Sequence, residues 1–337
     1  MTESLINQEQ VLAAFADLGK EFEAPSDLLM ALVQRSYDQN PWFTPENYKK
    51  AMANWANLLK FEHLKGFSEH YKKSKVQKRI GVITAGNIPM VGFHDILCVV
   101  LSGHIAVIKP SSKDNEVTKF IASFINKKLG EERCVISEQI DKKIDAVIAT
   151  GSNNSNRYFE QYFSHLPRIL RHNRRSIAIL NGTESEKELR ALSDDIFEYF
   201  GMGCRNVSLV FVPRSFDFTK CIDAMDHHSE LIHHNKYANN YTYHRALFLM
   251  NQQEHLDNGF VLFKEDRSLK APLGTLFYSY YTDIKEVEDF ISYHNSEIQC
   301  IVGNYSSELS IGFGQAQQPD LQDYADHVDS MKFLSEL

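Results

Sequence analysis

From Ile80 onward the chain repeats a short apolar strand, a turn rich in glycine or proline, and a helix with an apolar stripe. Strands are predicted at 81–84, 104–110, 134–136 and 146–149, and helices at 91–101 and 117–124. Strands that alternate with helices at this spacing form parallel βαβ units with helices on both faces of the sheet. A second series has strands at 176–180 and 209–212 around a helix at 185–200. The pattern predicts an α/β protein with two doubly wound lobes.

A chain of 337 residues exceeds the usual size of one domain. We predict helices over 1–76 that pack on a first lobe at 77–175, a second lobe at 176–310, and a C-terminal tail at 311–337. Apolar residues at three- and four-residue intervals indicate the first helix, and Ser26 and Thr44-Pro45 are typical starts of the next two. The third helix is predicted to continue through Phe61, and Ser111-Ser112 to cap the helix at 117–124. Further strands are predicted at 245–250, 276–281 and 300–302, and a helix at 284–293.

Composition excludes several classes of protein. A net charge of -8 argues against a nucleic-acid binder, which needs a concentrated basic surface. The five cysteines are widely spaced and form no Cys-x-x-Cys pair, which favours reduced thiols in the cytoplasm. No apolar run approaches about 20 residues, so we expect neither secretion nor membrane insertion. The basic run at 70–79 is interpreted as a solvated approach to the next strand, with a phosphate-binding site as the alternative.

One cysteine stands out by its neighbours. Cys204 follows Gly201 and Gly203 and comes directly before a buried strand. Glycines permit tight turns close to a bound molecule, and a loop at a strand end can lower the pKa of a thiol through its N–H groups. A nucleophile and a small buried hydrophobic residue are both compatible with this local pattern.

A histidine-rich segment raises a metal hypothesis. His227, His228, His233 and His234 lie within eight residues, but their spacing does not reproduce His-Glu-x-x-His, and no third ligand is placed by the sequence. We therefore favour a solvated helix face and predict no metal.

Several separated motifs resemble, in order, those of the aldehyde dehydrogenase superfamily. They are Ala-Gly-Asn-Ile-Pro-Met at 85–90, Val-Ile-Lys-Pro-Ser-Ser at 107–112, Thr-Gly-Ser at 150–152 and Gly-Met-Gly-Cys at 201–204. Within the superfamily the chain looks most like the acyl-CoA reductases related to the fatty-acid reductase of bacterial bioluminescence. The resemblance extends from about Arg79 to the end, including the stretch at 314–326.

The resemblance implies roles for individual residues. Cys204 matches the family's nucleophile, and Asn87 the amide that stabilises the developing oxyanion together with the Cys204 N–H. The first lobe would bind a dinucleotide and the second would be the catalytic lobe. The cofactor-binding residues would be Thr84, Lys109, Ser111, Ser112, Lys113, Gly151 and Ser152.

Departures from the family pattern refine this expectation. Hydrolytic members have a glutamate in a Glu-Leu-Gly-Gly-Lys run, and this chain has Arg-His-Asn-Arg-Arg-Ser at that place, 171–176. Without the carboxylate, the water that would hydrolyse an acyl-enzyme lacks its usual general base. Ser112, followed by Lys113, stands where NAD-preferring members often have a glutamate, which favours NADPH over NADH. The stretch at 270–274 lacks the glutamate of the family's Glu-x-Phe-Gly-Pro region. His172, Arg174 and Arg175 are general-acid candidates by position.

These observations predict an NADPH-dependent acyl-CoA reductase, with NADH as the alternative cofactor. It would form an aldehyde from a fatty acyl thioester through an acyl-Cys204 intermediate. The site would lie between two lobes, and the family resemblance implies a homodimer. An acyl-phosphate reductase or an aldehyde dehydrogenase of the same fold is the enzymatic alternative. The alternative of another class is a non-catalytic nucleotide-binding protein that retains the fold.

Overall fold

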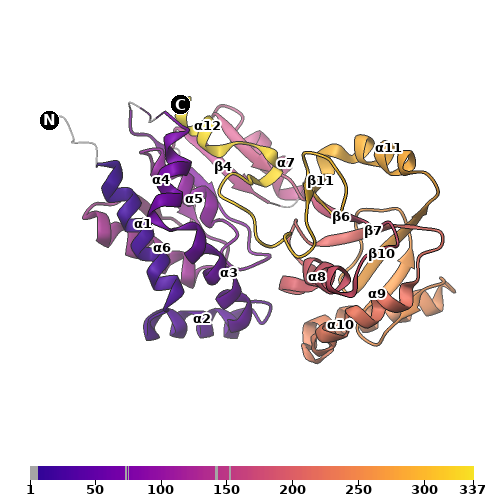
Figure 1. Ribbon diagram of the computed structural model, residues 1–337. Helices are drawn as coiled ribbons and strands as arrows, with labels where there is room; N and C mark the ends of the chain where they lie inside the picture. Colours follow the sequence, from indigo (N-terminus) through magenta and orange to yellow (C-terminus); the bar gives the residue numbers. More distant parts are fainter. Residues whose placement is uncertain (1–6, 73, 75, 141–142, 152) are drawn as a thin grey trace. The chain divides into compact units, whose positions relative to one another are not determined.

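The computed structural model describes residues 7–337 apart from 73, 75, 141, 142 and 152. The chain divides into two compact units. Unit 1 comprises the described residues up to His172 together with Asp320–Leu337, and unit 2 is Asn173–Pro319. The predicted strand and helix alternation occurs in both units, so each is described in turn (Figure 1).

Unit 1 is built on a parallel sheet whose strand order is β3-β2-β1-β4-β5 in the described part of the chain. Its strands are β1 (Arg79–Ile83), β2 (Ile105–Lys109), β3 (Cys134–Ile136), β4 (Ala146–Thr150) and β5 (Arg168–Arg171). Helices α5 (Phe93–Leu101), α6 (Glu116–Leu129) and α7 (Asn153–Tyr162) follow β1, β2 and β4. The strand order reverses between β1 and β4, and parallel sheets of this kind bind ligands at that point, outside the carboxyl ends of the strands.

The N-terminal helices belong to unit 1. They are α1 (Gln8–Glu23), α2 (Asp27–Gln39), α3 (Pro45–Leu58) and α4 (Phe61–Glu69). Ser26 and Thr44 cap α2 and α3 by accepting hydrogen bonds from backbone N–H groups, as predicted. In Figure 1 α1 runs beside α3, α4 and α6, because its apolar stripe packs against these helices.

In unit 1, two predictions at helix ends are wrong. The third helix does not run through Phe61, because α3 ends at Leu58 and α4 begins at Phe61. Helix α6 begins at Glu116, so Ser111-Ser112 do not cap it. The hydroxyl of Ser111 instead accepts from the N–H of Lys113 in the loop after β2. In unit 2, the helix predicted at 185–200 ends at Phe197.

Unit 2 is built on a second sheet, of order β12-β11-β6-β7-β10-β9-β8. All neighbouring strands are parallel except β8 and β9. The strands are β6 (Arg175–Ile179), β7 (Val207–Pro213), β8 (Leu256–Asp257), β9 (Leu262–Glu265), β10 (Thr275–Tyr281), β11 (Ile298–Val302) and β12 (Ser310–Ile311). The helices are α8 (Glu186–Phe197), η1 (Glu198–Gly201), α9 (Phe218–Ala224), η2 (Asp226–His233), α10 (Asn235–Met250), α11 (Ile284–His294) and η3 (Asn295–Glu297).

Alternate residues of the central strands face opposite sides of this sheet. Ala178 and Val210 belong to the apolar cluster formed with α8 and α9. Ile177 and Leu209, one position earlier, belong to the cluster formed with α11. A strand buried on both faces reads as a continuous apolar run, which explains why β6 and β7 were predictable from sequence.

The strand predicted at 245–250 is wrong, because these residues form the end of α10. A short apolar run does not distinguish a strand from a helix segment by itself. The solvated face predicted for the histidine-rich segment is also wrong in part. The side chains of His227 and His228 are only 20% and 15% exposed, whereas that of His233 is 74% exposed.

The C-terminal residues return to unit 1, where η4 (Ala325–His327) and α12 (Ser330–Ser335) lie. Helix α12 packs against α5. Among the described residues, no helix combines the length and apolar character needed to cross a bilayer.

Candidate active site

Cys204 lies in unit 2, in the loop between η1 and β7. The other four cysteines are buried, whereas Cys204 is half-buried. Burial raises the pKa of Cys221 to about 12 and that of Cys300 to about 11. These two thiols are therefore protonated at neutral pH, and Cys204 carries the accessible thiol of unit 2.

The backbone before Cys204 is strained. Tyr199, Phe200 and Gly201 have φ values of 51°, 60° and 74°, in the left-handed region. Only glycine adopts this region at little cost, so the two aromatic residues each store of order 1–2 kcal/mol. Such strain persists only where surrounding contacts hold the chain in place, and functional loops are common sites of it.

Asn206 holds this loop in place. Its side chain is buried, and its Nδ2 donates to the carbonyls of Asp195, Ile196 and Glu198 at 2.9–3.2 Å. Its Oδ1 accepts from the N–H of Gly203 at 2.7 Å. One amide therefore satisfies the carboxyl end of α8 and ties the residue before Cys204 to it.

Further contacts position the residues on either side of the thiol. The Ser176 hydroxyl, from β6, donates to the carbonyl of Cys204 at 3.1 Å. Arg205 donates through Nε to the carbonyl of Ala316 at 2.6 Å. The buried carboxylate of Asp195 accepts from the N–H groups of Gly314 and Ala316 at 2.6 and 2.8 Å. The stretch at 314–316, part of the resemblance, thus packs beside the cysteine loop.

The electrostatic surroundings of Cys204 include Arg175 at the start of β6. Burial lowers the pKa of Arg175, and its interaction with Cys204 acts in the opposite direction. A guanidinium that interacts with a thiol favours the thiolate, which is the nucleophilic form. Arg175 was predicted as a general-acid candidate by position, but a guanidinium does not give up its proton in proteins. Its interaction with Cys204 favours an electrostatic role.

Asn87 lies in unit 1, in the loop after β1, and is half-buried. This loop packs tightly on the loop after β2. A Cβ on Gly86 would lie 2.2 Å from the Ser111 hydroxyl, so only glycine fits there. The hydroxyl of Thr84 accepts from the N–H of Ser111 at 3.1 Å. The structure therefore brings together Thr84, Asn87, Ser111 and the base of Lys113.

A buried carboxyl group anchors the same loop. Asp114 accepts hydrogen bonds from the Met90 N–H and the Tyr48 hydroxyl, both at 2.8 Å. Met90 has a φ of 58°, so this bond holds a strained turn three residues after Asn87. Sequence reasoning missed Asp114, since its partner Tyr48 comes from a distant helix.

Asp114→Asn should reduce the pH dependence of stability. Burial raises the pKa of Asp114 from 3.8 to about 6. A raised pKa stabilises the fold when the group is protonated, an effect fully present below the unfolded pKa and lost as the pH rises through the folded value. Between pH 4 and 7 the free energy of unfolding of the variant should therefore rise by about 2 kcal/mol relative to that of the wild type. Urea unfolding across this range measures the difference.

Asp17→Asn is the matched control, since hydrogen bonds from Lys128 and Lys20 lower the pKa of Asp17. Its difference from wild type should move in the opposite direction with pH. A pH-independent difference for Asp114→Asn would contradict the buried-carboxyl interpretation.

A cavity of about 660 Å³ lies at the carboxyl ends of β1 and β2 in unit 1. Lys109 lines it, together with aromatic side chains of α7 that include Tyr158, Phe159 and Tyr162. A lysine beside exposed aromatic rings suits a phosphorylated aromatic ligand such as a nucleotide. Ser112 and Lys113 are exposed on the adjoining loop, Gly151 packs against Phe159 at the start of α7, and Ser152 lies outside the described residues.

The residues where hydrolytic relatives carry a glutamate have a structural role in unit 1. The Arg171 guanidinium is buried and pairs with Asp95 at 2.6 Å, and both bond Ser330 of α12. Burial alone would raise the pKa of Asp95, but Arg171 outweighs it and the pKa is lowered. His172 is exposed, and its N–H donates to Asp326 at 2.5 Å. This network fastens the C-terminal segment to the sheet.

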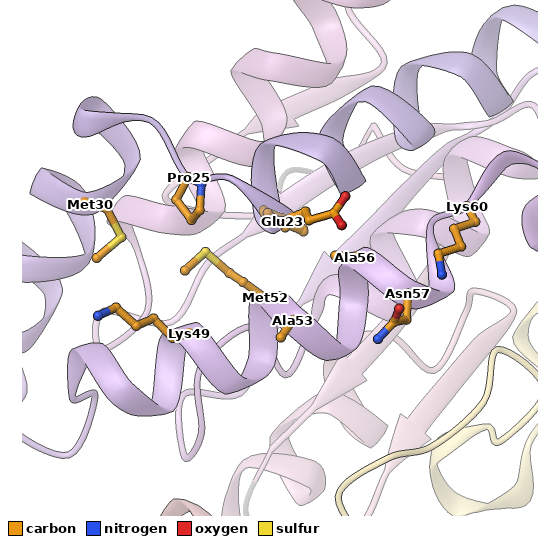
Figure 2. A pocket seen from close by; sticks show the side chains of 10 residues that line it. Glu23, Pro25, Met30, Lys49, Met52, Ala53, Ala56, Asn57 and Lys60 are labelled. Carbon is orange, nitrogen blue, oxygen red and sulfur yellow. The ribbon is translucent and has the colours of Figure 1, made fainter.

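A second cavity of about 630 Å³ lies among the N-terminal helices of unit 1 (Figure 2). Met30 and Met52 face it, with Lys49 toward one end and Lys60 toward the other. Its lining residues come from α1, α2, α3 and the turns after them, and among the described residues they include none predicted for the site.

The sequence of the chain matches a known protein family. The sequence model of the family described as acyl-CoA reductase (LuxC) matches residues 50–225, more than half of the chain. The chain belongs to the acyl-CoA reductase (LuxC) family. The matched region contains Asn87, Lys109 and Cys204. Membership of this family identifies an aldehyde-forming or aldehyde-oxidising oxidoreductase. A search of curated proteins finds no match.

Solved structures show that this acyl-CoA reductase family member has the aldehyde dehydrogenase fold. Aldehyde dehydrogenase 21 from Physcomitrella patens, solved with the product succinate, has a TM-score of 0.66 at 10% identity, covering 89% of this chain and 74% of its own. The indole-3-acetaldehyde dehydrogenase AldA of P. syringae, solved with NAD+, has a TM-score of 0.67 at 11% identity, covering 88% of this chain and 72% of its own. An oxidoreductase from Marinobacter aquaeolei has a TM-score of 0.65 at 12% identity, covering 94% of this chain and 80% of its own. These structures confirm the predicted α/β fold, and the sequence model confirms the predicted family.

Proposed function

We propose that the chain reduces a fatty acyl-CoA thioester to the aldehyde, with NADPH as reductant, through a covalent acyl-Cys204 intermediate. The observation that carries this proposal is the loop of Cys204. Cys204 is half-buried and follows a strained stretch of backbone. Asn206 holds this loop in place, and the Arg175 guanidinium interacts with the thiol. A rigidly held, accessible thiol next to a cation is the arrangement that nucleophilic catalysis needs.

The proposed reaction assigns steps to the protein's own groups. The Cys204 thiolate attacks the thioester carbonyl, and the resulting oxyanion is stabilised by the Cys204 N–H and the Asn87 amide. Collapse breaks the bond to the coenzyme A sulfur and leaves an acyl-cysteine. When bound, the reduced nicotinamide supplies the hydride that takes the acyl group to the aldehyde level. Release of the aldehyde restores the thiolate, and the coenzyme A thiolate takes up one proton.

The proposed cofactor site is the cavity at the ends of β1 and β2. Its volume of about 660 Å³ and its lining by Lys109 and aromatic rings fit the adenosine portion of a dinucleotide. Lys113 on the adjoining loop is exposed, and a lysine there would attract a 2′-phosphate. These features support NADPH as the preferred reductant.

The proposal is tested by comparing substrates. Purified protein is mixed with acyl-CoA thioesters of increasing chain length and either NADPH or NADH, and the loss of nicotinamide absorbance is followed with chemical trapping of the aldehyde. We expect consumption with long-chain acyl-CoA and faster turnover with NADPH. Activity confined to acyl phosphates would favour the alternative reductase, and activity only with an aldehyde and oxidised cofactor would favour a dehydrogenase. Absence of turnover with every donor would contradict the proposal.

Asn87→Ala should lower kcat on acyl-CoA by about 10²–10³-fold, since one oxyanion donor is lost. The KM for NADPH should change little, because the amide acts on the acyl group. Initial rates at saturating substrate measure the effect. Asn115→Ala is a suitable control, since among the described residues the Asn115 side chain makes no capping bond at the start of α6. Equal rates for the two variants would remove Asn87 from the mechanism.

A further inference from the structure

A cluster of three potential metal ligands lies in unit 2 and does not include the cysteine. Asp194 projects from α8, while His227 and His228 come from η2. The Asp194 Oδ1 lies 3.1 Å from Nε2 of His227 and 2.9 Å from Nε2 of His228. The three ligand atoms lie within 4.8 Å of one another. The sequence places no third ligand beside the histidines, and the fold supplies Asp194 from 33 residues upstream.

The hydrogen bonds of His227 point its lone pair into this cluster. Its Nδ1 lies 3.0 Å from the carbonyl of Ala224, and a carbonyl can only accept, so Nδ1 carries the proton. A neutral imidazole has one N–H, which leaves Nε2 with a lone pair. That lone pair faces a carboxylate oxygen of Asp194. Two acceptors face each other, and a second proton or a metal ion is required between them.

Ser193 presents a further lone pair to the same point. Its Oγ lies 3.4 Å from Nε2 of His227. Its single proton is donated to the carbonyl of Arg190 at 2.6 Å. The Ser193 Oγ therefore has no proton left to donate to Nε2 of His227, and Asp194 Oδ1 and Ser193 Oγ both face His227 Nε2 as acceptors. A cation satisfies this arrangement directly.

Packing holds the ligands in position. The His227 and His228 rings stack with centroids 4.1 Å apart, and His228 packs on Phe197 at 5.2 Å. Phe197 is buried and packs in turn on Phe260. The carbonyl bond to Nδ1 of His227 is the outer contact that commonly orients a metal-binding histidine.

We propose that Asp194, His227 and His228 bind one divalent transition-metal ion of the Zn²⁺ class, with water or the Ser193 hydroxyl completing the coordination. Two imidazole nitrogens and one carboxylate oxygen suit Zn²⁺, whereas Mg²⁺ and Ca²⁺ prefer oxygen ligands alone. The ion would link α8 to η2. Asp195, the next residue of α8, accepts from the N–H of Ala316, and Asn206 donates to the carbonyl of Asp195. The link would therefore brace the part of α8 that holds the cysteine loop.

The test uses the full-length, untagged protein after treatment with a chelator. Zn²⁺ is titrated by calorimetry, and Co²⁺ is added separately to follow the visible absorption of a four-coordinate site. We expect one Zn²⁺ per chain and a rise in Tm on binding. Loss of an outer contact to a metal ligand costs about 10–100-fold in affinity, so Asp194→Asn and His228→Gln should each weaken binding at least as much. The Co²⁺ band should disappear in both.

His233→Gln is the matched control, because His233 is exposed and lies 3.8 Å from the equally exposed Glu230. It should bind Zn²⁺ like the wild type. The Tm of each metal-free variant is compared with that of the metal-free wild type, so a folding defect is separated from loss of a ligand. Binding that is absent in the wild type, or that survives in both ligand variants, overturns the proposal. The result is independent of the proposed acyl-CoA reduction.

Discussion

Cys204→Ala should abolish acyl-CoA reduction while the protein remains folded. Loss of a catalytic nucleophile removes the covalent route, and comparable losses in other enzymes are on the order of 10⁴-fold or more in kcat. The replaced side chain is half-buried and small, so the fold should tolerate alanine there. The measurement is the initial rate with NADPH and acyl-CoA, with circular dichroism as the check on folding.

The covalent intermediate provides a second measurement. Incubation with acyl-CoA in the absence of reductant should add the mass of one acyl group to the wild type and nothing to the variant. Cys221→Ala is the matched control, because burial raises the pKa of Cys221 to about 12 and keeps its thiol protonated. It should retain both activity and acylation. A Cys204→Ala protein that is acylated or turns over at the normal rate would refute the proposed mechanism.

Asn206→Asp should destabilise unit 2 strongly. The substitution replaces an N–H₂ group that donates to three carbonyls with an oxygen, in a buried position. A buried charge left facing acceptors costs about 3–5 kcal/mol. We expect this loss in the free energy of unfolding, measured in urea. Alkylation of Cys204 should also become less selective, since the strained loop loses its anchor.

Asn258→Asp is the control for the same chemical change. Within the part of the chain that the structure describes, Asn258 bonds the turn before β9 through Oδ1 alone, which accepts from the N–H groups of Phe260 and Val261. An aspartate keeps that acceptor, so stability should change by about 0.5 kcal/mol or less. Equal unfolding midpoints for the two variants would show that Asn206 does not anchor the loop.

Much of the fold was predictable because its signals are local. Strands such as β6 and β7, buried on both faces, appear as continuous apolar runs, and the starts of α2 and α3 carry capping residues. The error at 245–250 has the same origin. A run of six residues carries too little periodicity to separate a strand from the last turns of α10.

Sequence alone identified the candidate site residues, since the order of the motifs along the chain is a property of the chain itself. It determined Cys204, Asn87 and Lys109 as candidates, and the family that the comparisons confirm. Those site roles remain predictions, to be tested by the variants above.

Only the tertiary structure decided which other groups support them. Asp114 meets Tyr48 across 66 positions, Arg205 meets Ala316 across 111, and Asp194 meets His227 across 33. None of these pairs has a local signal, because a hydrogen bond between distant segments depends on how sheets and helices pack and not on neighbouring residues. The sequence thus determined where a nucleophile could stand, and packing decided what holds its loop and what gathers around the histidines.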